Sequence, residues 1–397
     1  MFVVHFICIV GAWSSTKVLA ANQDYMKNII SNYFSQPRHH EADLDYKNRS
    51  RDLIFSEFKR LGLETTVQNF SQEKVTFSNV IGVSRGFRIG KKDDKIVAVG
   101  AHYDTTQNSS GVDDNGSGMA AMFEVARQID EHRQKGEQIN NTVIFMAFDL
   151  EEGVHIGSNM TIYRWLLPWL VKTYGRETAL ALRPNGIIIL DGLMNFNSSA
   201  RSQTFQVEET DWKEKSKQRT GGAMFYLHVA AMFPNMSSTN MSGNFLALTY
   251  SSDQPNSSLT YTLANNWAVH SDASKYHLHK FGLLNSYSNP YVSRFLKSTS
   301  ASNFWMDKIP AIVLHDTGNY RGDLTECPSC DDKRMLTEGN LMFLDHVVDV
   351  IGKTVFNLSE IHMPAAENDG MGTHPSSAPR AVSTMVLVHA MMLLIYD

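Results

Sequence analysis

The sequence predicts an α/β protein with three layers, in which helices cover both faces of a mixed, largely parallel central sheet. Short apolar, β-branched runs occur at 75–83, 95–104, 141–150, 186–193 and 309–316. Several of these runs are almost continuously apolar, as in strands that are buried on both faces. Helical segments lie between them, and such alternation is typical of a parallel sheet with helices packed on each side.

The helices are predicted from apolar residues spaced three or four positions apart. Leu53, Ile54, Phe58 and Leu61 follow this spacing in one of the segments, with charged residues between them. We expect helices at 43–61, 117–129, 159–174 and 334–354.

The stretch 195–300 is polar and rich in sequons. It predicts an irregular insertion around the site, within one catalytic domain over 21–360.

Composition indicates a large globular protein. Lys and Arg number 36 against 41 Asp and Glu, and no basic block dominates any stretch, which argues against a nucleic-acid partner. With 10% aromatic residues and 3 Cys, the chain falls outside the disordered and disulfide-scaffold classes. Nothing in this arithmetic indicates an oligomeric state.

The first residues have the form of a secretory signal peptide over 1–20. Residues 2–13 are apolar, and the small residues around Ala20 suit cleavage, although the usual basic start is missing. The alternative is a buried first helix. A signal peptide would direct the protein to the secretory pathway.

The last residues, 361–397, have the form of a GPI-attachment signal. A spacer rich in Gly, Ser and Pro precedes the apolar run 381–396, and small residues stand upstream of it at 368–370. The run is shorter than the roughly 20 residues that span a bilayer. The alternatives are a tail helix packed on the domain or a short membrane anchor. We therefore expect an extracellular protein, held at the cell surface by a lipid or released.

Glycosylation sequons and cysteines support the same compartment. The number of N-glycosylation sequons is higher than chance predicts. Cys327 and Cys330 are expected to form a disulfide in an oxidising compartment, rather than a redox pair or a zinc knuckle. Each of the following residues begins an N-x-[ST] motif: Asn48, Asn69, Asn108, Asn115, Asn140, Asn159, Asn197, Asn235, Asn240, Asn256 and Asn357.

Carboxylates and a histidine gather at the ends of the predicted strands. Parallel strands bring their carboxyl ends to one edge of a sheet, so we expect these side chains to lie together. Like charges at such closeness need cations, and a pair of divalent metals with a bridging carboxylate supplies them. The residues in question are His102, Asp104, Asp114, Glu151, Glu152 and Asp191.

These motifs resemble the co-catalytic zinc exopeptidases of the bacterial leucyl-aminopeptidase type, which are related to glutaminyl cyclases, plasma carboxypeptidases and the transferrin-receptor/glutamate-carboxypeptidase group. The order and spacing agree over roughly residues 40–355. The resemblance is carried by NVIG at 79–82, AHYD at 101–104, GVDDNGSG at 111–118, FDLEE at 148–152 with GS at 157–158, LD at 190–191 and IPA at 309–311.

The resemblance implies a role for each residue. His102 and Asp191 would hold one zinc ion, Asp114 would bridge two, and Glu152 would belong to the second site. Asp104 would orient His102, and Glu151 would be the general base that activates water. Asn115 would lie buried beside the metal and carry no glycan.

The chain departs from the family's pattern at the second zinc. Where the family supplies a histidine after tyrosine, this chain has Arg321, which cannot ligate zinc because it stays protonated. Where the family usually has Ser-Asp-His, it reads Thr299-Ser300-Ala301. Three interpretations stay open: His315 substitutes as a ligand, only the first metal binds, or the site is degenerate. His155, His270, His277 and His279 are interpreted as ordinary surface or loop residues.

The expected function is a zinc metallo-exopeptidase, an aminopeptidase that acts on extracellular peptides with a free N-terminus, with Glu151 as base. Two ions are expected from the resemblance, or one if the second site is lost. One alternative is a cell-surface pseudo-peptidase that binds without catalysis. A weaker one is a glutaminyl-cyclase-like enzyme, for which the final zinc-binding histidine is absent.

Overall fold

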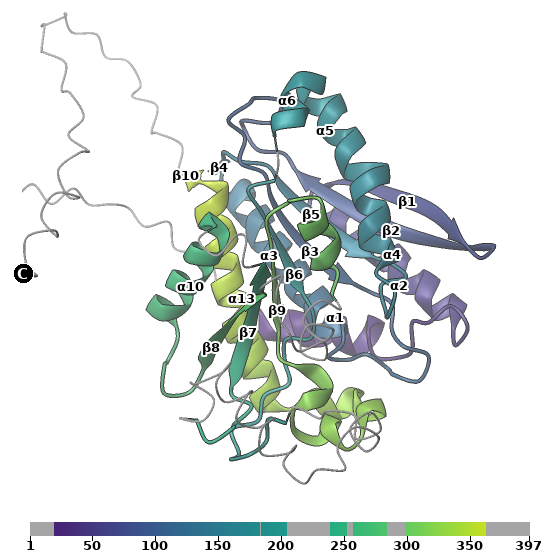
Figure 1. The fold of residues 1–397 in the computed structure, drawn as a ribbon, viewed down its shortest axis with the longest axis vertical. Coiled ribbons are helices and arrows are strands. Elements are labelled where there is room, and N and C mark those ends of the chain that lie inside the picture. Colours follow the sequence, from purple (N-terminus) through teal and green to yellow (C-terminus); the bar gives the residue numbers. More distant parts are fainter. Residues whose placement is uncertain (1–19, 183, 205–238, 252–256, 284–298, 363–397) are drawn as a thin grey trace, which may run out of the picture. The chain divides into compact units, whose positions relative to one another are not determined.

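A computed structural model describes residues 20–182, 184–204, 239–251, 257–283 and 299–362. Its centre is an eight-stranded sheet with the order β1-β2-β5-β3-β6-β9-β7-β8 (Figure 1). Strands β10 and β4 pair in a separate two-stranded sheet. The strands are β1 (Glu64–Gln72), β2 (Val75–Ser84), β3 (Val97–His102), β4 (Gln138–Ile139), β5 (Val143–Phe148), β6 (Gly186–Leu190), β7 (Phe245–Ser251), β8 (His277–Leu283), β9 (Ala311–His315) and β10 (Ile361–His362).

The middle of the sheet is parallel, and its flanks are not. Strands β5, β3, β6 and β9 run parallel, and His102 at the end of β3 pairs with Phe148 of β5. Strand β2 is antiparallel to β5, and β7 is antiparallel to β9. The strands β3, β5 and β6 are buried along their whole length, as the continuous apolar runs predict.

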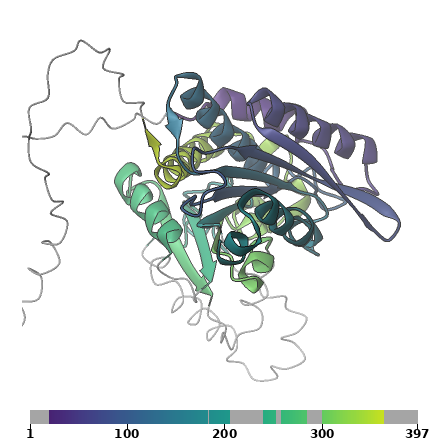
Figure 2. The same cartoon turned by 90° about the horizontal axis from the view of Figure 1, so that it is seen from above.

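Helices cover both faces of this sheet, and Figure 2 shows them on either side. Side chains such as Val99 and Phe145 pack on one face with α1, α2, α3, α10 and α13, whereas Ala98 and Ile144 pack on the other with η1, α5 and α12. The predicted three-layer α/β/α architecture with a mixed, largely parallel sheet is confirmed. The helices are α1 (Gln23–Tyr33), α2 (Leu44–Arg60), α3 (Gly116–Gln134), α4 (Ile156–Thr161), the π-helical η1 (Ile162–Leu166), α5 (Leu167–Tyr174), α6 (Arg176–Ala181), α10 (Ser258–His270), α12 (Ala301–Met306), α13 (Glu338–Ser359) and the 3-10 turns η2 (Gly318–Tyr320), η3 (Gly322–Thr325), η4 (Pro328–Cys330) and η5 (Lys333–Met335).

The irregular character predicted for the insertion over 195–300 is wrong for the part of that stretch that the structure describes. Strand β7, helix α10 and strand β8 form a crossover unit whose two strands pair in parallel and extend the central sheet beyond β9. Strand β7 is buried through Phe245–Thr249. This apolar run is short and lies between polar, sequon-rich segments, so the average composition of 195–300 does not reveal it.

Both predicted terminal signals lie outside the described residues, except for Ala20 and the start of the predicted tail signal at 361–362. Within the described part of the chain, no helix has the length and apolarity needed to cross a membrane.

Candidate metal centre

The predicted ligands lie at the carboxyl ends of three neighbouring parallel strands. His102 ends β3, Asp191 follows β6, and Glu151 and Glu152 come shortly after β5. Asp114 stands in the loop that leads into α3. Because β5, β3 and β6 are adjacent in the sheet, these ends meet at one edge, where open α/β sheets hold their ligands.

Three of these side chains form one compact set. Nε2 of His102 lies 3.2 Å from Oδ1 of Asp114 and 3.4 Å from Oδ1 of Asp191. One ligand atom from each residue lies within 4.8 Å of the other two. Oδ1 of Asp114 is buried and accepts no hydrogen bond from the described residues. The three atoms therefore converge on a single small space.

This donor set suits a zinc ion. Zinc takes imidazole nitrogen and carboxylate oxygen, and one imidazole with two carboxylates leaves a further position open for water or substrate. Nδ1 of His102 donates to the backbone oxygen of Asp104 at 3.1 Å, so Nε2, which lies beside Asp114 and Asp191, is the nitrogen that would give up its proton to bind the ion. The residues present thus fit the ion that the motifs imply.

The electrostatics show how strongly this edge attracts a cation. Burial lowers the pKa of His102, but its contacts with Asp104, Asp114 and Asp191 outweigh burial and hold that pKa well above the usual value. Burial, together with the charge of Asp114, raises the pKa of Glu152 well above its usual value. A bound cation would relieve the repulsion among these carboxylates.

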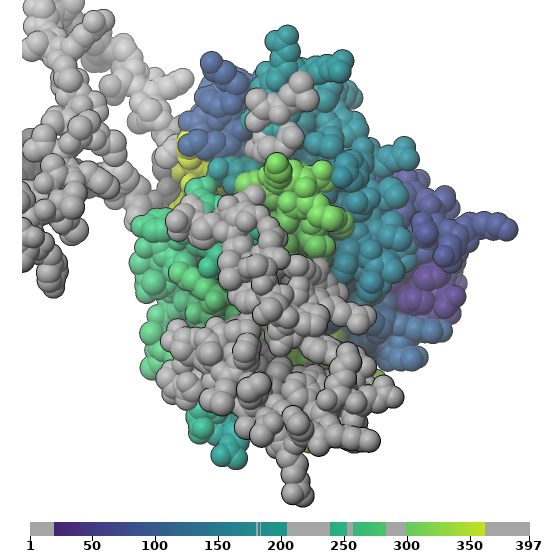
Figure 3. Space-filling model, viewed as in Figure 1, coloured from purple at the N-terminus to yellow at the C-terminus, as the bar shows by residue number. Residues whose placement is uncertain are grey.

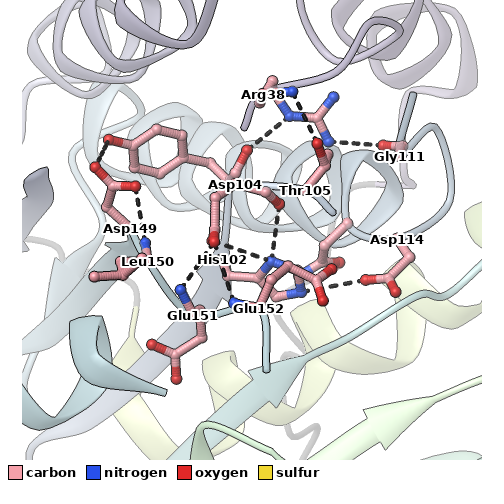
Figure 4. A network of polar contacts seen from close by, with 12 residues as sticks. Arg38, His102, Asp104, Thr105, Gly111, Asp114, Asp149, Leu150, Glu151 and Glu152 are labelled. Atoms are coloured by element: carbon pink, nitrogen blue, oxygen red, sulfur yellow. Dashed lines mark hydrogen bonds and ion pairs between the residues drawn. The ribbon is translucent and has the colours of Figure 1, made fainter. Parts of the chain in front are cut away.

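Asp104 holds the loop that carries the two glutamates. Its Oδ2 accepts the N–H of Glu151 at 2.9 Å and the N–H of Glu152 at 3.1 Å, as Figure 4 shows. Its Oδ1 lies 3.5 Å from Nδ1 of His102. Asp104 therefore links the imidazole to the glutamate backbone and does not face the open side of the cluster.

Glu151 is oriented by a serine that the sequence motifs contain but to which they assign no role. Ser158 donates its N–H to one carboxylate oxygen of Glu151 at 2.8 Å and its hydroxyl to the other at 2.6 Å. Asn303 of α12 in turn donates to the Ser158 hydroxyl oxygen at 2.8 Å. Helix α12 contacts α4, and Figure 3 shows the green segment to which α12 belongs beside the teal one. Helix α12 thus supports the proposed base from behind.

Two of the histidines interpreted as ordinary loop or surface residues make specific contacts, and His155 does lie in a loop, as expected. Nδ1 of His155 lies 3.6 Å from a carboxylate oxygen of Glu151, because the left-handed backbone at His155 turns the chain back over the loop. His279 is buried in β8 against Phe245. The contact of His279 with Phe245 comes from tertiary packing, which short motifs do not reveal, whereas His155 and Glu151 are only four residues apart.

Asp331 holds the loop that carries Asp114, and the sequence motifs do not include it. Its two carboxylate oxygens accept the N–H of Asp113 at 2.7 Å and of Asp114 at 3.0 Å. It follows Cys330, which the structure joins to Cys327 by a disulfide. No local sequence signal marks Asp331, because more than two hundred residues separate it from its partners.

Buried cations from the N-terminal segment also offset the acids. The fully buried Arg38 donates to the backbone oxygens of Tyr103 and Gly111 at 2.7 and 2.8 Å, behind the ligand loop (Figure 4). Lys47 pairs with Asp149 at 2.6 Å, and both side chains are buried. These two contacts tie α2 and the segment before it to the edge of the sheet that carries the site.

The expected second metal site is not assembled in the same way. Neither Glu152 nor His315 belongs to a set of three ligand atoms as close as the His102 set among the described residues. His315 ends β9, and its Nε2 lies 3.1 Å from the Thr249 hydroxyl. Burial lowers the pKa of His315 to about 4, so the ring is neutral at physiological pH.

Arg321, which stands where the family has histidine, is fully buried in a structural position. It donates to Gln203 at 2.9 Å and to the backbone oxygen of Asn195 at 2.7 Å. Its guanidinium lies over the ring of Phe245 at 4.4 Å. The side chain therefore joins β7 to the loops around 195–203. Arg321 is not a member of the metal cluster.

Asn115 is completely buried, as predicted. Its side-chain oxygen accepts the N–H groups of Gly118 and Gly192, each at 3.1 Å, and its amide donates to the backbone oxygen of Leu190 at 2.8 Å. The sequon at Asn115 is thus inaccessible in the folded chain and instead joins the start of α3 to the end of β6.

Residues 79–217 match the model of peptidase family M28. Aminopeptidase Y of Saccharomyces cerevisiae is 39% identical over 70 residues, which is 18% of this chain and 12% of that protein. Aminopeptidase YwaD of Bacillus subtilis is 35% identical over 96 residues, or 24% of this chain and 20% of that protein. The matched stretches thus span a fifth or less of these two relatives.

The fold is similar to solved structures across most of the chain. A zinc aminopeptidase from Bacillus subtilis has a TM-score of 0.55 at 13% identity, with 87% of this chain and 96% of that one covered. A glutaminyl cyclase from Porphyromonas gingivalis has a TM-score of 0.50 at 15% identity, with 86% and 98% covered. At these low sequence identities, the similarity concerns the fold alone.

Proposed function

We propose that this chain, which belongs to peptidase family M28, is a zinc-dependent aminopeptidase that removes residues from the N-termini of extracellular peptides. One observation carries the proposal. The ligand atoms of His102, Asp114 and Asp191 converge at the edge of the sheet, and the loop after the neighbouring strand β5 carries Glu151, whose carboxylate is held by Ser158. The relatives named as aminopeptidases support the same reaction class.

The chemistry divides between the ion and the chain. Zinc bound by His102, Asp114 and Asp191 would lower the pKa of a water molecule and polarise the peptide carbonyl. Glu151 would act as the general base that takes a proton from water and then returns it to the leaving amine. Ser158 holds both Glu151 oxygens, and Asp104 holds the Glu151 backbone, so the base is already oriented before substrate binds.

We propose a single tightly bound ion. The His102 set is assembled, whereas Arg321 is committed to Gln203 and Asn195, and His315 contacts Thr249. Elemental mass spectrometry of the dialysed protein gives the number of zinc ions per chain and distinguishes one ion from two. His102→Ala should then remove the bound zinc, whereas His315→Ala should leave it in place.

The activity test compares wild type with Glu151→Gln, expressed as the full chain in secreting eukaryotic cells. Zinc content and release of the first residue from unblocked peptides are measured on the same samples, with N-acetylated peptides as the blocked control. The variant should keep its zinc and lose about 10²- to 10⁴-fold in kcat. Wild type that holds zinc but cleaves no peptide would favour the cell-surface binding protein instead. Cyclisation of N-terminal glutamine without cleavage would favour the cyclase.

We also propose that the protein is secreted and held at the cell surface by a lipid. The apolar start, the sequons, the disulfide and the C-terminal pattern support this location. Treatment of expressing cells with a phospholipase that cuts GPI anchors should release the protein into the medium. Retention on the cells would argue for another attachment.

A further inference from the structure

The first described residues are held by acidic side chains of two other helices. The backbone N–H of Ala21 donates to Oδ1 of Asp349 in α13 at 2.7 Å. The next N–H, of Asn22, donates to Oε1 of Glu124 in α3 at 3.0 Å. Ala20, the residue before this contact, is exposed. The N-terminus of α1 is thus anchored to α3 and α13.

The carboxylates around Ala21 exceed the cations that pair with them. Glu124, Asp345 and Asp349 form an acidic cluster, and Glu124 is fully buried. Arg127 pairs with Glu124 and is shared with Glu131, which lies outside the cluster. Among the described residues, Lys353 lies 4.0 Å from Asp349. The acidic cluster therefore holds uncompensated negative charge.

Asp345 shows the effect of this excess. Its Oδ1 is buried and has no hydrogen-bond partner among the described residues. Burial, then the charges of Asp349 and Glu124, raises the pKa of Asp345 to about 6. A cationic hydrogen-bond donor would pair with this carboxylate oxygen and reduce the repulsion from the neighbouring carboxylates.

We propose that cleavage between Ala20 and Ala21 creates this cation, and that the new α-ammonium of Ala21 binds the acidic cluster. Hydrolysis breaks the Ala20–Ala21 bond, the water oxygen passes to the Ala20 carbonyl carbon, and the freed amine takes up a proton. The inference rests on the proposed secretion, because Val18 and Ala20 supply the small residues that signal cleavage needs.

Cleavage changes what the Ala21 nitrogen can do. An amide offers one N–H, whereas an ammonium offers three donors and a positive charge, and charge-assisted bonds are about twice as strong as neutral ones. The α-amino group, with a usual pKa near 8, is charged at neutral pH. The processed chain therefore ties α1 to α3 and α13 more firmly. Processing completes the fold rather than only removing a targeting segment.

The experiment uses the full chain secreted from eukaryotic cells. Intact mass should place the first residue of the purified protein at Ala21. A second version carries Gly-Ser inserted after Ala20, so that the mature chain starts two residues earlier and its ammonium lies outside the cluster. We expect this insertion to lower Tm by about 3 °C.

Two variants separate the ion pair from other effects of the insertion. Asp349→Asn removes the partner of Ala21, so the insertion should then lower Tm by much less. Asp24→Asn, an exposed acid on α1, should leave the effect of the insertion intact. A different first residue, or equal Tm values with and without the insertion, overturns the inference. Because none of these readouts involves zinc or turnover, such a result would leave the proposed peptidase activity untouched.

Discussion

Oδ2 of Asp331 accepts the N–H of Asp114 at 3.0 Å, although 217 residues separate the two in the chain. The same carboxylate accepts the N–H of Asp113. Asp114 is the ligand that stands in a loop rather than at a strand end, so its position depends on such outside support. Asp331 is thus a positioning residue for the metal centre.

We therefore expect Asp331→Ala to weaken zinc binding about 10- to 100-fold, the usual cost of losing a group that orients a ligand. Asp331→Asn should fall between wild type and Asp331→Ala, because its amide oxygen still accepts a hydrogen bond. Zinc affinity is measured by competition with a chromophoric chelator, and the visible spectrum of the Co²⁺-substituted protein reports ligand geometry. The adjacent, more exposed Asp332 pairs with Arg334, so Asp332→Asn should bind zinc like wild type. Equal affinities for Asp331→Ala and wild type would contradict the assignment.

Ser158 should matter for rate and not for metal. Ser158→Ala removes the hydroxyl that donates to Glu151 at 2.6 Å and leaves the backbone N–H in place. A less well oriented base should lower kcat about 10- to 100-fold with little change in KM or in zinc content. Asn303→Ala, which acts on Glu151 through Ser158, should cost less. A normal kcat for Ser158→Ala would show that the hydroxyl does not orient the base.

Restoring the family's histidine should fail to create a second metal site. Arg321→His would remove the contacts with Gln203, Asn195 and Phe245 and leave their polar groups unpaired. Breaking a buried charged network of this kind costs about 3 kcal/mol. We expect unchanged zinc stoichiometry and a lower free energy of unfolding, measured with denaturant. Arg334→His at the surface should change stability by less than about 0.5 kcal/mol. A second bound ion in Arg321→His would show that the site is only one side chain from completion.

The strands that carry the site could be predicted because they are buried and apolar. The runs at 95–104, 141–150 and 186–193 became β3, β5 and β6, with shorter bounds. Strand β1 was missed because it is an edge strand that pairs only with β2 and exposes most of its side chains. Its sequence, ETTVQNFSQ, has too few apolar residues to stand out.

The cluster could be predicted for a related reason. A side chain at the end of a parallel strand must lie near the ends of the neighbouring strands, so His102 and Asp191 could be placed from sequence. Arg38, Lys47 and Asp331 have no such constraint. Loops and helix packing bring them to the site, and their roles consist of contacts across the chain.

His279 should make stability sensitive to acid. Burial, then the charges of His277 and Arg321, lowers the pKa of His279 to about 4, and its Nε2 has no hydrogen-bond partner among the described residues. In the unfolded chain the pKa of this histidine is near 6.5, so between about pH 6.5 and 4 the unfolded chain binds a proton at His279 that the folded chain does not. This stability is fully present above about pH 6.5 and is lost as the pH falls toward 4.

At pH 5 the loss from this one group is about 2 kcal/mol. His279→Leu should therefore lose less free energy of unfolding than wild type when guanidinium unfolding at pH 7.5 is compared with pH 5. The exposed His270 provides the control: burial lowers its pKa as well, and His270→Leu should change the acid loss by less than His279→Leu does. An identical acid loss in His279→Leu and wild type would mean that His279 is protonated in the fold. In that case an imidazolium would pack on Phe245 at 4.5 Å, although the guanidinium of Arg321 already lies over the same ring.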